Sequence, residues 1–167
     1  MLLRGRGRAA GIEAILSICG HREFPIDMPE IEKKLILHFD DIEPPDPDDS
    51  LSMYRHWARQ KWAKENGLIL QAPVPGDAQR IIDFARATSE ANGTVLFQCQ
   101  GGTSRSPAAA LICLATWLGD GQEQNVVELL LRARPSAVPL RGLVGFGDTL
   151  LNREGRLLRA LNQRLRG

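Results

Sequence analysis

The chain alternates short apolar runs with longer amphipathic stretches. Residues 14–20 (AILSICG), 34–39 (KLILHF) and 95–97 (VLF, after an Asn-Gly turn) form short apolar runs, which favour β-strands over helices. Residues 14–20 have the nearly continuous apolar character that is typical of a parallel strand buried on both faces. The proline-limited stretch 68–75 predicts a further extended segment at the edge of the sheet.

Apolar residues at helical spacing mark the stretches between and after these runs. Intervals of three and four residues predict amphipathic helices over 77–91 and 123–134 and a short helix over 50–66. Strands that alternate with helices predict an α/β fold. We expect a short central, mainly parallel β-sheet of about four strands, flanked by helices on both faces.

The whole chain, 1–167, is expected to form a single domain, because this length suffices for one hydrophobic core. The last stretch, 153–167, carries leucines on one face with five arginines around them and predicts a basic C-terminal helix. Such a helix either docks on a partner or an acidic surface, or packs on its own domain.

Composition narrows the classes of function. The formal net charge of +1 gives no general reason to expect a nucleic-acid partner. Three cysteines without a C-x-x-C pair, and three scattered histidines, argue against a disulfide framework and a zinc site, and we expect no metal or other cofactor.

The N-terminal basic stretch precedes an apolar run that is too short for a secretory signal or a membrane span. We therefore expect a cytoplasmic protein.

One loop joins the strand at 95–97 to a long apolar helix, in the stretch VLFQCQGGTSRSPAAALICLATWL. Ser106 and Pro107 suit the start of that helix, the serine as a cap and the proline at the first helical position. A loop between a strand end and a helix N-terminus directs backbone amides and the positive end of the helix dipole at one small volume, where an anion can bind. The residues expected to surround this anion are Gln100, Gly101, Gly102, Thr103, Ser104 and Arg105.

Cys99 and Arg105 stand in a C-x5-R spacing across this loop. A cysteine beside so many amides should have a lowered pKa and supply a thiolate nucleophile. The planar guanidinium of Arg105 suits two oxygens of a phosphate. Ser106 can donate a hydrogen bond to the thiolate when it becomes the leaving group. Together these groups predict phosphoryl transfer through a cysteinyl-phosphate.

The loop resembles the active-site loop of the protein tyrosine phosphatase superfamily, whose motif is HC-x2-G-x2-R-[ST], and most closely that of its compact dual-specificity-like and bacterial members. The resemblance implies Cys99 as nucleophile, Arg105 as ligand of the phosphate and the transition state, and Ser106 as the hydroxyl that assists the second step. It also implies a phosphorylated protein as substrate. The chain departs from the motif at Gln98, where the family usually has a histidine that helps to lower the thiol pKa.

An acidic loop, residues 40–50 (DDIEPPDPDDS), follows the strand at 34–39. In the family the general acid is an aspartate on a loop after a strand upstream of the cysteine, and FDDIEPP resembles that arrangement. The resemblance implies Asp41, which lies three residues before the proline pair, as the general acid. Asp40 is expected to hold the loop through hydrogen bonds to the backbone. The alternative is a solvated acidic turn.

Related small bacterial phosphatases connect the acid loop to the next helix more briefly. Residues 50–75 therefore resemble an insertion near the active-site entrance. Its basic residues either attract an anionic substrate or form a solvated face over a core stripe of tryptophans.

Two other functions stay open. A catalytically weak, phosphate-binding pseudophosphatase is favoured by Gln98 alone and opposed by the intact Cys99, Gly102 and Arg105. A rhodanese-like sulfurtransferase also uses a cysteine in an anion cradle, although its loop typically has another length.

Overall fold

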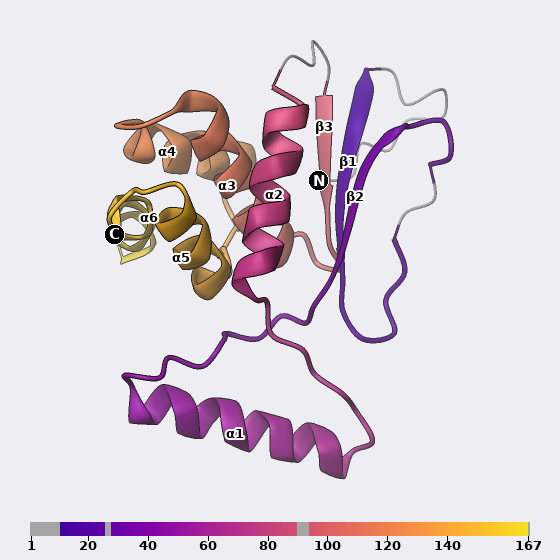
Figure 1. The fold of residues 1–167 in the computed structure, drawn as a ribbon, viewed down its shortest axis with the longest axis vertical. Helices are drawn as coiled ribbons and strands as arrows, with labels where there is room; N and C mark the ends of the chain where they lie inside the picture. Colours follow the sequence, from indigo (N-terminus) through magenta and orange to yellow (C-terminus); the bar gives the residue numbers. More distant parts are fainter. Residues whose placement is uncertain (1–10, 26–27, 90–93, 167) are drawn as a thin grey trace.

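The computed structural model describes residues 11–25, 28–89 and 94–166. The N-terminal basic stretch and the Asn92-Gly93 turn lie outside the described residues. Strands and helices follow one another along the chain (Figure 1) as β1 (Ile12–Cys19), β2 (Lys33–His38), α1 (Ser50–Glu65), α2 (Pro75–Ala87), β3 (Thr94–Gln98), α3 (Arg105–Leu118), α4 (Glu123–Ala133), α5 (Arg141–Leu150) and α6 (Arg156–Arg166). The predicted class, a single α/β domain with a parallel sheet and flanking helices, is confirmed.

The sheet has the order β2-β1-β3, and both neighbours run parallel to β1. Its central strand is buried from Ala14 to Cys19, as the continuous apolar run predicts. Ser17 of β1 is aligned with Ile36 of β2 and Gln98 of β3. Because the strands are parallel, the segments that follow them all begin at the same edge of the sheet, which we call the carboxyl edge.

Residues 68–75 do not form the expected edge strand. Pro73 and Pro75 have no backbone N–H to donate to a strand ladder. The backbone of Gln71 bonds to Asp40 instead, because Asp40 N donates to Gln71 O (2.7 Å) and Gln71 N donates to Asp40 Oδ2 (2.8 Å). Within the described residues the sheet therefore has three strands rather than four, and this segment is tied to the acidic loop.

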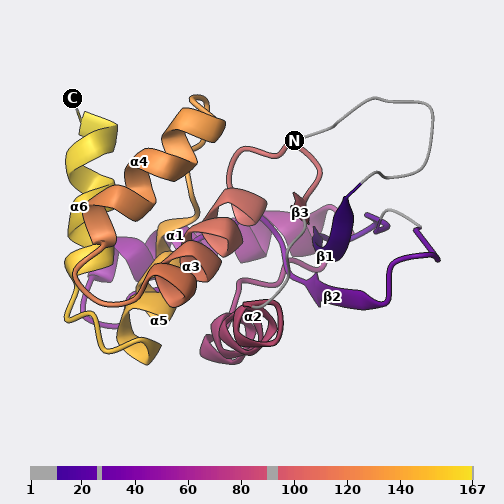
Figure 2. The same ribbon diagram turned by 90° about the horizontal axis from the view of Figure 1, so that it is seen from above.

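The helices α2 to α6 lie on one side of the sheet (Figures 1 and 2), although the sequence predicts helices on both faces. The reason is the connection between β1 and β2, whose described residues form no helix. The core lies between the sheet and the helices α2 and α3, where Leu16, Ile18, Ile81, Leu111 and Ile112 are fully buried.

Helix α1 stands apart from the other helices, beyond the carboxyl edge of the sheet (Figure 1). Ala63 is its one buried residue, whereas Tyr54, Trp57 and Trp62 are 62%, 54% and 56% exposed. No other helix or strand of the described chain packs closely along α1. The expected core stripe of tryptophans is therefore wrong.

The C-terminal stretch packs on its own domain. Helix α6 lies against α4 and α5 (Figure 2), and its residues Leu157 and Leu161 are fully buried. The buried carboxylate of Asp148 in α5 accepts hydrogen bonds from the backbone N atoms of Gly155 (2.5 Å) and Leu157 (2.7 Å). These bonds satisfy free amides at the start of α6 and fix it to α5.

Candidate active site

The segment from Cys99 to Arg105, here called the cysteine loop, joins β3 to α3 at the carboxyl edge of the sheet (Figure 1). Helix α3 begins at Arg105 with Ser104 in the cap position, so the expectation that Ser106 caps it is wrong. The physical reason is a competing contact, because Ser106 Oγ lies 3.1 Å from Cys99 Sγ. The serine hydroxyl thus serves the thiol rather than the helix amides.

The thiol of Cys99 is surrounded by hydrogen-bond donors. Besides the Ser106 hydroxyl, Gly102 N donates to Sγ over 3.3 Å. Gly102 has a φ of +62°, a backbone conformation that glycine adopts without strain. Burial raises the pKa of Cys99, but the hydrogen bonds from Ser106 and Gly102 and the charge of Arg105 outweigh it and bring this pKa below its ordinary value. The site therefore favours a thiolate, the reactive form of cysteine.

The other two cysteines are free, buried thiols of a different kind. Burial raises the pKa of Cys19 and of Cys113. Of the three thiols, only Cys99 has the electrostatic surroundings of a nucleophile.

Two carbonyls of the cysteine loop accept hydrogen bonds from the segment 138–140. Thr103 O accepts from Val138 N (2.8 Å), and Ser104 O accepts from Leu140 N (3.3 Å). In a planar trans peptide the C=O and the following N–H point in opposite directions. The amides that follow these carbonyls therefore face away from residues 138–140, as an anion cradle requires.

The guanidinium of Arg105 is buried and oriented by protein oxygens. Its Nη1 and Nη2 each donate to a different carboxylate oxygen of Glu23, both over 2.9 Å, and Nη1 also donates to Phe39 O over 3.3 Å. Its buried Nε has no hydrogen-bond partner among the described residues. Buried polar atoms are normally paired, and an oxygen of a bound phosphate would pair this one.

Glu23 is a site residue that the sequence does not reveal. It lies in a tight turn after β1, where Glu23 N donates to Gly20 O (3.1 Å) and Gly20 N donates to Glu23 Oε2 (2.7 Å). A Cβ on Gly20 would come within 2.7 Å of Asp40 Oδ1 and 3.0 Å of Arg105 Nη1, so a larger residue there would displace the carboxylate or the guanidinium. The one feature of the sequence that could have indicated Glu23 is its position as a carboxylate shortly after a parallel strand. Asp40 and Asp41 have the same position after β2.

The two aspartates of the acidic loop face different partners. Asp41 Oδ1 accepts a hydrogen bond from Ser104 Oγ over 2.6 Å, which places this exposed carboxylate at the cysteine loop. Asp40 accepts from His21 N through Oδ1 and from Gln71 N through Oδ2, both over 2.8 Å. Asp40 thus ties backbone segments together, the role that its position in the sequence favours.

Glu43 anchors the acidic loop at a third point. Its carboxylate accepts hydrogen bonds from Arg141 N (3.0 Å) and Gly142 N (2.7 Å), at the start of α5. A carboxylate at this end of a helix is favoured by free amides and by the helix dipole. The acidic loop is therefore fastened on both sides of Asp41.

Gln98, the departure from the family motif, makes no side-chain hydrogen bond among the described residues. Its buried Oε1 and the Oγ of Ser17, the aligned residue on β1, both lack a partner there. Gln98 therefore does not orient the thiol of Cys99. The hydroxyl of Ser106 and the amide of Gly102 contact the sulfur instead.

The described residues contain no group of three or more His, Cys, Asp or Glu side chains arranged to hold a metal ion. Within the same residues, no helix has the length and apolar character needed to cross a bilayer.

Comparisons with known proteins add little to this geometry. No protein-family model matches the chain, and no curated protein matches it. One solved structure that superposes on it is the crystal structure of DUSP15, with a TM-score of 0.48 and 21% identity over 92% of this chain and 79% of that chain.

Proposed function

We propose that this protein is a cysteine-dependent phosphatase that hydrolyses phosphomonoesters on protein side chains through a cysteinyl-phosphate. The observation that carries the proposal is the contact between Cys99 Sγ and Ser106 Oγ at 3.1 Å, with Gly102 N at 3.3 Å from the same sulfur. A buried thiol has no structural need for such donors, whereas a thiolate that must attack and then leave needs them.

In the first step the thiolate of Cys99 attacks phosphorus, a P–S bond forms and the P–O bond to the substrate breaks. The leaving oxygen takes a proton from the carboxyl group of Asp41. Arg105 and the amides of the cysteine loop bind the non-bridging oxygens, where charge is spread in the transition state.

In the second step water attacks phosphorus and the P–S bond breaks. Asp41, now a carboxylate, accepts a proton from the water, and inorganic phosphate is released. The departing thiolate receives the hydrogen bond of Ser106, so the same hydroxyl that lowers the thiol pKa also assists this step.

Turnover of p-nitrophenyl phosphate, with and without a metal chelator, tests the proposal. We expect hydrolysis that the chelator does not change and that is lost in Cys99→Ser, whose loop and guanidinium still bind phosphate. Phosphate binding without hydrolysis in the wild-type protein would instead support a pseudophosphatase. Sulfur transfer from thiosulfate without phosphate hydrolysis would support the rhodanese-like alternative.

A further inference from the structure

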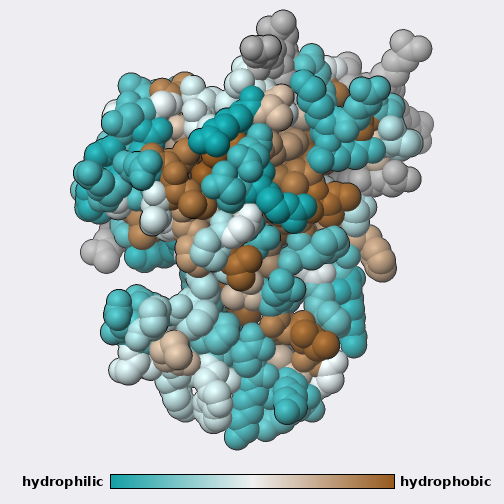
Figure 3. Space-filling model, in the orientation of Figure 1, coloured by the Kyte–Doolittle hydropathy of each residue, from teal (hydrophilic) through white to brown (hydrophobic). Residues whose placement is uncertain are grey.

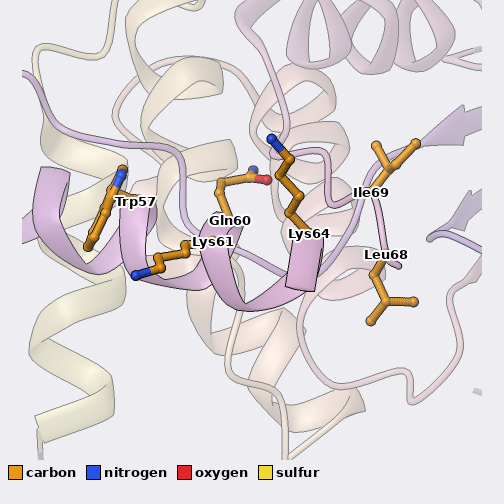
Figure 4. Close-up of a pocket in the computed structure, with 6 residues that line it drawn as sticks. All are labelled: Trp57, Gln60, Lys61, Lys64, Leu68 and Ile69. Atoms are coloured by element: carbon orange, nitrogen blue, oxygen red, sulfur yellow. The ribbon is translucent and has the colours of Figure 1, made fainter. Parts of the chain in front are cut away.

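A groove lies between α1 and the segment that follows it. It is lined by Trp57, Gln60, Lys61, Lys64, Leu68 and Ile69 and has a volume of about 590 Å³ (Figure 4). None of these residues belongs to the cysteine loop. We call this feature the α1 groove.

The apolar residues around the groove are unusually exposed for their type. Ile69 is 76% exposed and Trp57 is 54% exposed, and Figure 3 shows apolar surface beside the polar surface of α1. Since α1 packs closely along no other element of the described chain, these side chains contribute little to the core. Large exposed aromatic groups mark binding surfaces, and tryptophan is among the residues that carry most of the energy at interfaces.

The charge of α1 selects an anionic partner. The helix has four basic residues and a single carboxylate, Glu65. Lys61 lies 5.3 Å from the centre of the Trp57 ring and 4.0 Å from Glu65, in an exposed pair that holds it only weakly. Lys61 and Lys64 are therefore available to carboxylates of a partner.

The position of α1 connects it with the candidate active site. Figure 1 shows α1 beyond the carboxyl edge of the sheet, the edge at which the cysteine loop lies. The acidic loop leads from Asp41, which contacts Ser104 of the cysteine loop, to Asp49, whose carboxylate caps α1 through Leu51 N. A single protein that places a phosphate at Cys99 can therefore also contact α1.

The acidic loop also argues against a membrane as the anionic partner. Asp46, Asp48 and Asp49 are exposed at the start of α1. A broad anionic bilayer resting on α1 would approach these carboxylates and be repelled, whereas a peptide segment can occupy the groove alone.

We propose that the α1 groove binds an acidic segment of the same phosphoprotein whose phosphorylated side chain enters the cysteine loop. Carboxylates of that segment pair with Lys61 and Lys64, and an apolar side chain packs against Trp57. This inference rests on the proposed phosphatase function and adds to it a class of substrate, a phosphoprotein with acidic residues away from the phosphate.

The test compares two phosphorylated probes. One is a random glutamate–tyrosine copolymer phosphorylated on tyrosine, and the other is p-nitrophenyl phosphate, which is too small to reach α1. In the double variant Lys61→Glu/Lys64→Glu, and in Trp57→Ala, we expect kcat/KM for the copolymer to fall on the order of tenfold, with kcat/KM for p-nitrophenyl phosphate unchanged. The matched control, Lys33→Glu/Lys34→Glu at the start of β2, should leave both values unchanged.

Binding of the same copolymer to Cys99→Ser, followed by fluorescence anisotropy, separates this inference from the proposed function. Binding that depends on Lys61 and Lys64, together with a wild-type protein that hydrolyses neither probe, would refute the phosphatase function but keep the groove. Hydrolysis of the copolymer that Lys61→Glu/Lys64→Glu and Trp57→Ala both leave unchanged would overturn the groove and keep the function. Binding of α1 to phosphatidylserine vesicles, without competition from the copolymer, would also overturn it in favour of a membrane surface.

Discussion

Arg105 and Glu23 form a two-pronged ion pair across 82 positions of sequence, with both nitrogen–oxygen distances at 2.9 Å. The side chain of Arg105 is 5% exposed and that of Glu23 is 20% exposed, so water screens the pair poorly. Glu23 holds the guanidinium next to the cysteine loop and is a positioning residue for Arg105.

Replacing Glu23 by alanine should lower the free energy of unfolding by about 2–3 kcal/mol, because a buried guanidinium loses its carboxylate. Chemical denaturation of the two proteins measures the difference. The control is Glu30→Ala, at an exposed position of the same connection between β1 and β2. It should have little effect on the free energy of unfolding. Equal stability of wild type and Glu23→Ala would show that the pair does not hold Arg105 in place.

The same pair predicts a pH dependence of stability. Burial raises the pKa of Glu23, but hydrogen bonds from Arg105 and Gly20 and the charge of Arg105 bring it below its ordinary value of 4.5. A carboxylate with a lowered folded-state pKa stabilises the fold fully above its ordinary pKa, and that stability is lost as the pH falls through the folded value. Unfolding free energies of wild type and Glu23→Gln, measured at successive pH values below 4.5, should converge as the pH falls. A constant difference between them would contradict this.

Ser106→Ala should raise the pKa of Cys99, because it removes the hydroxyl that lies 3.1 Å from the sulfur and helps to lower that pKa. The rate of thiol alkylation by iodoacetamide, measured against pH, should shift its midpoint upward. Thr116→Ala removes a hydroxyl that bonds within α3, to Ile112 O, and should leave the midpoint in place. If the two variants titrate alike, Ser106 does not tune the nucleophile.

Asp41→Asn should slow hydrolysis of an alkyl phosphate by ~10²–10⁴, because the poor leaving group needs a proton. It should slow hydrolysis of an activated aryl phosphate far less. Asp40→Asn is the matched control, since the Asp40 carboxylate accepts from the backbone of His21 and Gln71 and the amide replaces one of these two acceptor oxygens. It should lower stability rather than change the leaving-group dependence. The reverse pattern would make Asp40 the general acid.

The parts of the fold that could be predicted from the sequence are those marked by patterns of neighbouring residues. The run from Val95 to Leu118 has a strand pattern, a glycine turn and an apolar helix, so the sequence predicts the order strand, cysteine loop and helix correctly. The start of α3 was predicted two positions too late, with Ser106 instead of Ser104 as the cap, because the Ser106 hydroxyl contacts the thiol rather than the helix amides.

What the sequence could not predict depends on contacts between distant segments. The pair of Glu23 and Arg105 leaves no periodic pattern, and the bonds of Gln71 with Asp40 replace a strand ladder with a cross-link between loops. The tryptophans of α1 have the spacing of a core stripe, yet no element packs against them closely enough to bury them. Spacing gives the helix, but only tertiary contacts decide which of its faces are covered.

The most direct test of the account is detection of the cysteinyl-phosphate itself. Ser106→Ala, in which we expect a slower second step, is mixed with p-nitrophenyl phosphate, quenched in acid and analysed by intact-protein and peptide mass spectrometry. We predict one added phosphoryl group, carried by the peptide that contains Cys99, and none in Cys99→Ser. Steady hydrolysis by Cys99→Ser, or a phosphoryl group on another residue during turnover, would contradict the central claim that Cys99 is the nucleophile.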